Sequence, residues 1–101
     1  MDVQYGTGDE MFDSEGRVLT LEFTNLVLLS VYAPHSGEEE KKFENRIKIF
    51  DESLRRYLST LKAVKTKPII VAGDLNVALN NIDIFDPEKN KNTPGFRKEE
   101  R

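Results

Sequence analysis

The residue types best suited to chemistry occur in the tetrapeptide Gly73-Asp74-Leu75-Asn76, which follows an apolar run. Ligands of α/β sheets gather at the carboxyl ends of strands, and a carboxylate presented there can act as a general base or a metal ligand. Asn76 points the same way as Asp74 if the backbone is extended, and its amide can donate an N–H to an oxyanion. Gly-Asp and Asn are also ordinary turn formers, so a plain turn remains the alternative.

A second candidate is the heptapeptide VYAPHSG at 31–37, which follows another apolar run. Tyr32 offers a phenolic hydroxyl and His35 a titratable imidazole, both close to a predicted helix N-terminus, which favours anions. The alternatives are a packing role for Tyr32 and an exposed turn position for His35.

The third candidate is the segment from Lys89 to Lys98, which contains four cations and no acid. Cations and short amides on an irregular loop suit contacts with a phosphate backbone. A flexible, polar connector is the alternative. The cations are Lys89, Lys91, Arg97 and Lys98, interleaved with Asn90, Asn92, Thr93 and Phe96.

Three strands and one helix are expected to position these candidates. Residues 17–23 alternate in polarity and residues 26–32 are almost continuously apolar, which predicts a hairpin. Residues 69–72 are short and wholly apolar, which predicts a strand buried on both faces. Residues 82–85 are expected to form a short extended piece, and the chain after Asp86 a polar loop with no apolar stripe to bury.

Residues 38–62 are predicted to form one amphipathic helix. Ser36 and Glu39 fit a capping box at its start. Apolar residues then recur at steps of three and four, a stripe that would lie on a sheet. The expected architecture is α/β, strand-strand-helix-strand with a loop-rich tail. One helix on a sheet that is apolar on both sides leaves one sheet face bare.

The composition of this 101-residue, 11.6 kDa chain excludes several kinds of site. The absence of cysteine rules out disulfides, thiolate nucleophiles and Cys-based zinc sites, and a single histidine rules out a His-rich metal centre. No apolar run is long enough to span a membrane and no signal peptide is visible, so we expect an intracellular location, nuclear or cytoplasmic. Residues 1–40 carry nine acids and one base, and residues 41–101 fourteen bases and nine acids. This asymmetry indicates either a polyanionic partner or simply solvated faces.

Together these segments resemble the exonuclease III-type apurinic/apyrimidinic (AP) endonuclease family, within the endonuclease/exonuclease/phosphatase superfamily. GDLN alone marks the superfamily. The longer GDLNVA, a following Ile-Asp pair and an Asn-rich loop ending in Gly-Phe are specific to the DNA-repair branch. In this sequence the matching stretches are DSEGR at 13–17, VYAPHSG at 31–37, IIVAGDLNVA at 69–78, ID at 82–83 and the loop 87–96.

The resemblance implies a four-layer, DNase I-like α/β sandwich that cleaves DNA 5′ to abasic sites with the help of Mg²⁺ or Mn²⁺. Asp74 matches the carboxylate that orients or deprotonates the attacking water, and Asn76 the amide that holds the scissile phosphate. Both lie near metal in the family, so they are also candidate metal ligands. Tyr32 matches a tyrosine beside the phosphate and Asn90 a DNA-phosphate contact. His35, Thr93, Lys89 and Lys91 complete the expected DNA-contacting set.

The chain departs from the family pattern at several positions and in length. His35, Asp86 and Thr93 stand where the family has Asn, and Leu79 and Asn81 replace the usual His and Glu. The family domain is more than twice as long, and the Glu that is its principal metal ligand and its Asp-His pair have no match here. We therefore expect residues 1–101 to be the central fragment of one such domain, with little or no activity alone. Another superfamily phosphodiesterase or phosphatase, or a fragment that binds nucleic acid without catalysis, remains open.

Overall fold

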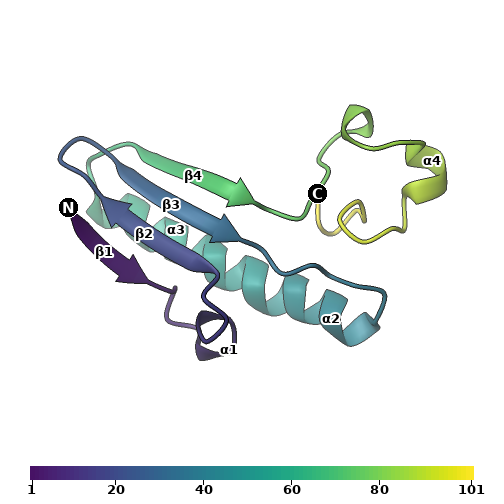
Figure 1. Cartoon of the computed structure of the whole chain (residues 1–101), viewed down its shortest axis with the longest axis horizontal. Coiled ribbons are helices and arrows are strands. Elements are labelled where there is room, and N and C mark those ends of the chain that lie inside the picture. The colour runs from purple at the N-terminus through teal and green to yellow at the C-terminus, as the bar shows by residue number, and fades with distance from the viewer.

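The computed structural model describes all residues from 1 to 101, and it contains a single four-stranded sheet with the strand order β1-β2-β3-β4 (Figure 1). β1, β2 and β3 are antiparallel neighbours, whereas β3 and β4 are parallel. The strands are β1 Asp2–Tyr5, β2 Val18–Glu22, β3 Val27–Tyr32 and β4 Ile69–Asp74. The predicted hairpin is confirmed. β1 is an additional strand, because residues 2–5 find pairing partners on the free edge of β2.

A long helix connects β3 to β4, as the apolar stripe predicts. It consists of α2 (Glu40–Glu44), a π-helical stretch η1 (Asn45–Asp51) and α3 (Glu52–Val64). The predicted capping box is wrong, because the helix begins at Glu40 and the Glu39 side chain makes no capping hydrogen bond. The Ser36 hydroxyl is buried instead, without a partner in the chain.

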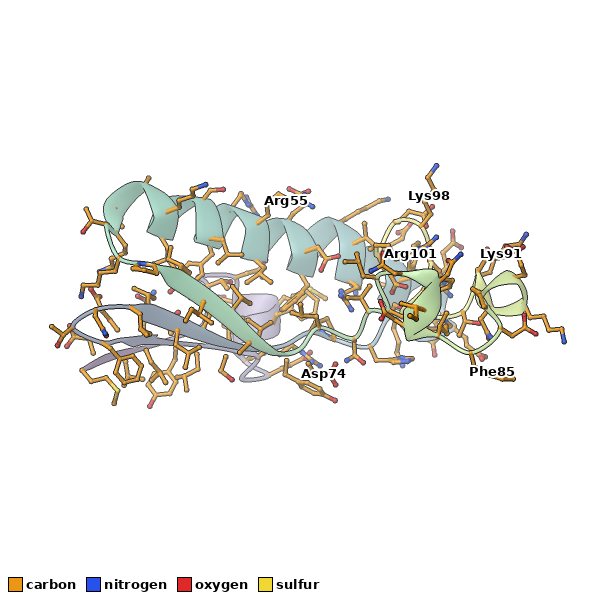
Figure 2. All side chains as sticks on the ribbon, turned by 90° about the horizontal axis from the view of Figure 1, so that it is seen from above. Arg55, Asp74, Phe85, Lys91, Lys98 and Arg101 are labelled. Carbon is orange, nitrogen blue, oxygen red and sulfur yellow. The ribbon has the colours of Figure 1, made fainter.

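The core lies between the helix and one face of the sheet. Figure 2 shows the helix on one side of the strands and the opposite side open. Val18, Val27, Leu29 and Val31 point toward the helix and are buried there with Phe50. The expected bare sheet face is therefore present, and the α/β class is confirmed as one sheet layer and one helix layer.

β4 lies at the edge of the sheet and is not buried on both faces, so that prediction is wrong. Its only strand neighbour is β3, and Ile70 and Val71 are 47% and 39% exposed. An apolar composition indicates burial only when neighbours lie on both sides, and here one edge and one face of β4 have none.

The segment after β4 differs from its prediction in two respects. Residues 81–83 form a 3₁₀ turn, η2 (Asn81–Asp83), where an extended piece was expected, because Asn80 and Asp83 form a reciprocal capping box at its N-terminus. The tail also has an apolar anchor, since Phe96 is only 1% exposed. Two short helices complete the fold, α1 (Glu10–Asp13) and α4 (Pro87–Asn90). None of the helices has the length and apolar character required to cross a membrane.

Candidate active site

The parallel pairing of β3 with β4 places two of the predicted site residues at the same end of the sheet. Tyr32 and Asp74 are register partners and are the last residues of their strands. One further hydrogen bond continues the pairing, since the Ala33 amide donates to the Asp74 carbonyl at 2.8 Å. The carboxyl ends of both strands thus form one edge, as expected for a ligand site of an α/β sheet.

Gly73 allows β4 to stay paired with β3 up to Asp74. Its φ of +130° lies in the region that favours glycine, and a Cβ built there would lie 2.0 Å from the Val31 carbonyl oxygen. No real Cβ tolerates that distance. The glycine before Asp74 is therefore a requirement of close strand approach as well as of a turn.

Asn76 folds back over the end of β3. Its φ is +48°, a left-handed conformation that Asn adopts more readily than most residues, so the extended backbone expected between Asp74 and Asn76 is wrong. The Asn76 side chain donates from Nδ2 to the Ala33 carbonyl at 2.7 Å, and its backbone amide donates to Asp74 Oδ1 at 2.8 Å. The two residues are brought together by this turn.

Asp74 and Asn76 each keep an oxygen without a partner. Asp74 is exposed at the end of β4 (Figure 2), and its Oδ2 accepts no hydrogen bond from the chain; neither does Asn76 Oδ1. Carboxylate and amide oxygens suit Mg²⁺, which is often held by one or two protein oxygens together with phosphate and water. No group of three or more His, Asp or Glu side chains gathers anywhere in the chain. Asp74 Oδ2 and Asn76 Oδ1 are thus two neighbouring oxygens whose chemistry suits a divalent cation.

Tyr32 faces solvent, so a packing role does not account for it. It is 56% exposed, and the Arg17 guanidinium lies 5.4 Å from its ring centre. Arg17 also donates to the Tyr32 carbonyl at 3.0 Å and to Glu15 at 2.6 Å. These contacts fix the end of β3 and leave the phenol accessible.

His35 lies on the loop beyond β3, and its ring is held by its own turn. The Gly37 amide donates to His35 Nδ1 at 3.0 Å, which fixes the orientation of the ring. Tyr32 and His35 both line a hollow of about 330 Å³ together with Arg17 and Lys42. The hollow combines cations with a phenol and an imidazole, which are groups that can bind an anion, and its one carboxylate, Glu15, is paired with Arg17.

The Asn-rich loop uses its predicted contact residues internally. Asn90 donates to the carbonyls of Phe85 and Asp86, at 2.7 and 3.1 Å, and accepts from the Thr93 hydroxyl at 3.0 Å. Lys89 pairs with Asp86 at 3.1 Å. Asn90 therefore shapes the loop in this conformation.

Lys91 belongs to a different group of cations, in the tail. It lines a hollow of about 460 Å³ with three other cations and Phe43. Arg97 stacks on Phe43, with 4.3 Å from the guanidinium carbon to the ring centre. Figure 2 shows Lys91 well separated from Asp74 along the long axis of the molecule. The other cations are Arg97, Lys98 and Arg101.

Arg46 is a site residue that the sequence prediction missed. It is 3% exposed and donates to the carbonyls of Pro34 and Leu75, at 2.8 and 2.7 Å. A signal was present, because Arg46 lies three residues after Phe43 and four before Phe50 and so stands on the apolar stripe. A cation on the buried face of a helix needs acceptors to lie nearby.

Two comparisons with sequences bear on this site. No protein-family model matches the chain. It is 42% identical to an exodeoxyribonuclease of Bacillus subtilis over 101 residues, which cover 100% of the chain and 39% of that protein. It is also 42% identical to a DNA-(apurinic or apyrimidinic site) endonuclease of Dictyostelium discoideum, covering 98% of the chain and 27% of the relative.

Solved structures give the same result for the fold. An AP endonuclease from Archaeoglobus fulgidus superimposes with a TM-score of 0.84 at 27% identity, over 99% of the chain and 38% of that protein. The AP endonuclease LMAP from Leishmania major superimposes with a TM-score of 0.73 at 33% identity, over 95% and 32%. The chain spans less than half the length of these relatives. Along almost its whole length the chain is therefore similar to one segment of exodeoxyribonucleases and apurinic/apyrimidinic endonucleases, which supports its identification as a fragment of the exonuclease III type.

Proposed function

We propose that the chain forms the central part of a DNA-repair phosphodiesterase that cleaves DNA 5′ to abasic sites. The observation that carries this proposal is the meeting of Tyr32, Asp74 and Asn76 at one edge of the sheet. Relatives that match the whole chain are an exodeoxyribonuclease and an AP endonuclease.

The proposed reaction adds water to the scissile phosphorus. Asp74 orients the water and accepts its proton on Oδ2, the bond to the leaving sugar oxygen breaks, and that oxygen takes a proton from solvent. Asn76 has one Nδ2–H beyond its bond to Ala33 and donates it to a phosphate oxygen, and the Tyr32 hydroxyl donates to another. When bound, Mg²⁺ or Mn²⁺ would neutralise the charge that develops on the phosphate, and Asp74 and Asn76 would be the residues of this chain that hold it.

A chimera tests the assignment. The matching segment of the Bacillus subtilis exodeoxyribonuclease is replaced by these 101 residues, and cleavage of abasic and intact duplex DNA is measured with Mg²⁺ and with Mn²⁺. We expect a clear preference for abasic DNA, and a loss of about 10²–10⁴-fold in kcat for Asp74→Asn. Asp83→Asn is the matched control, because Asp83 caps its own turn.

The chain by itself is expected to show little or no cleavage, because it offers only two oxygen ligands and no histidine beside Asp74. Robust Mg²⁺-dependent cleavage by the purified chain, abolished by Asp74→Ala, would overturn that expectation. A chimera that folds and binds DNA without cleaving it would favour a purely binding role.

The cations of the tail favour DNA binding as a separable property. Lys91, Arg97, Lys98 and Arg101 line one hollow with a single carboxylate, Glu99. We expect the chain alone to bind DNA in a salt-dependent way, and the double variant Lys91→Ala, Lys98→Ala to reduce the number of counterions released on binding by about two. Absence of binding at low salt would contradict this.

A further inference from the structure

Arg46 is the only charged residue among the buried residues of the chain, and its guanidinium contacts two separate loops. Nη1 donates to the Pro34 carbonyl at 2.8 Å, on the loop after β3. Nη2 donates to the Leu75 carbonyl at 2.7 Å, on the loop after β4, and Nη1 lies 3.5 Å from the Asn76 carbonyl. Nε pairs with Asp51 at 2.9 Å. Every nitrogen of the fork thus has an acceptor.

The π-helical stretch explains how Arg46 and Asp51 can meet. In an α-helix, residues five apart lie about 140° apart around the axis, so their side chains diverge. The i→i+5 repeat of a π-helix places such residues about one turn apart on nearby faces. η1 spans Asn45–Asp51 and contains both. The π-helical geometry therefore places Arg46, already paired with Asp51, at the end of the sheet.

The two loops have few other connections. Strand pairing between β3 and β4 ends at Tyr32 and Asp74. Beyond it, Ala33 provides one amide and one carbonyl to the opposite loop. Asn76 holds a left-handed backbone, a conformation that costs of the order of 1–3 kcal/mol and persists only when its surroundings fix it. The planar fork of Arg46 bonds to the carbonyl just before Asn76 and is well suited to that task.

We propose that Arg46 is a positioning residue, which clamps the loop after β3 to the loop after β4 and thereby fixes the directions of the Asp74 carboxylate and the Asn76 amide. Its consequence for catalysis depends on the function proposed above. Its consequence for the geometry of the two loops does not.

A purely stabilising role does not explain Arg46 as well. Burial raises the pKa of the Asp51 carboxyl, and the hydrogen bond from Arg46 offsets this only in part. Buried ion pairs are in general weak sources of stability, because removing both charges from water costs about as much as their attraction returns. In addition, the guanidinium donates hydrogen bonds to carbonyl groups of two different loops.

The test compares three variants of the 101-residue chain by NMR. Arg46→Lys keeps the charge but can reach only one loop at a time. Asp51→Asn removes the ion pair and leaves the carbonyl contacts, and Arg55→Lys is the matched control on an exposed part of the helix. We expect the amide signals and the backbone coupling constant of Asn76 to change in Arg46→Lys alone. Equal changes in Asp51→Asn, or no change in Arg46→Lys, would overturn the proposal, and so would an Arg46→Lys chain that fails to fold.

Activity is measured in the chimera with the same substitutions. We expect Arg46→Lys to lower kcat about 10²-fold with KM changed less than about threefold, because a small misplacement of reacting groups affects the chemical step. We also expect added guanidinium to restore part of the activity of Arg46→Ala. An inactive chimera with a displaced Asn76 signal would refute the proposed function and leave the positioning role. An active chimera whose kcat is unchanged by Arg46→Lys would support the proposed function and refute the positioning role.

Discussion

At the scale of single residues, the edge of the sheet depends on backbone positions that few residue types can occupy. Gly73 lies against the Val31 carbonyl at a positive φ, and Asn76 turns back in a left-handed conformation. Both are immediate neighbours of the Asp74–Leu75 pair. The spacing of the GDLN motif is therefore set by backbone geometry as well as by the chemistry of its side chains.

Gly73→Ala is expected to destabilise the chain by at least about 3 kcal/mol, because the new Cβ would overlap the Val31 oxygen and force β4 away from β3. Gly8→Ala is the matched control, since Gly8 also has a positive φ, of +98°, but nothing lies within 4 Å of an added Cβ. It should cost about 1–2 kcal/mol. Urea unfolding measures both, and equal losses would show that φ alone matters at Gly73.

At the scale of elements, ionic contacts tie the far end of the hairpin to the end of the helix. Glu22, the last residue of β2, accepts from Lys65 at 2.6 Å and from Lys67 at 2.9 Å. Both lysines stand between α3 and β4. The contacts fasten the link between the helix and the edge strand at the end of the sheet opposite to Asp74.

Stability should depend on pH through Glu22. The hydrogen bonds from Lys65 and then Lys67 hold the pKa of the Glu22 carboxyl below its ordinary value of 4.5. An acid with a lowered pKa in the folded state contributes stability that is complete above 4.5 and is lost as the pH falls through the folded pKa. The melting temperatures of wild type and Glu22→Gln should therefore differ most above about pH 5 and converge in stronger acid. A gap that widened below pH 4.5 would contradict this.

The tail is an element in its own right, and Phe96 anchors it. Phe96 is 1% exposed, the Arg101 guanidinium stacks on its ring at 4.2 Å, and the Ala78 amide donates to the Gly95 carbonyl at 2.8 Å. The tail thereby returns to the segment that follows Asn76.

Phe96→Ala should cost about 3–5 kcal/mol, or release the tail without unfolding the sheet. Phe85→Ala should change stability by less than about 0.5 kcal/mol, since Phe85 is 90% exposed. Hydrogen exchange distinguishes these two results for Phe96→Ala. If only the tail is released, the Ala78 amide exchanges faster while the β3 amides stay protected. Similar effects of the two substitutions would mean that the tail is not anchored as described.

At the scale of the whole molecule, the core is one-sided. The chain measures 45 × 29 × 20 Å, and its one helix layer covers one face of the sheet (Figures 1 and 2). On the other face Val3, Leu21, Leu28 and Ile70 form one cross-strand row. Val3 and Ile70 are 43% and 47% exposed. The same kinds of apolar residue therefore have different energetic roles on the two faces.

Matched substitutions on the two faces should differ in cost. Leu29→Ala removes a side chain that is 0% exposed and should cost about 3 kcal/mol, whereas Ile70→Ala on the open face should cost about 1 kcal/mol or less. Chemical unfolding of both variants measures the difference. Comparable losses would show that the open face is covered in solution.

Local pattern was sufficient for several features. The alternation in residues 17–23 and the apolar runs at 26–32 and 69–72 located β2, β3 and β4, and the three-four stripe located the long helix. Motif spacing singled out Tyr32, Asp74 and Asn76, which the structure brings to one edge. The exposure of β4 and the burial of Phe96 were mispredicted, since each depends on neighbours distant in the sequence.

The sequence by itself determined the class of the fold, the order of β2, β3, the long helix and β4, and the resemblance to a family of DNA-repair enzymes, because these depend on periodicity and on local motifs. Only the tertiary structure decided how the site is held. The convergence of Arg46 on Pro34 and Leu75 joins residues 12 and 29 positions away from it. Such contacts form only after β3, the helix and β4 have packed together, and no local pattern encodes the distances between them.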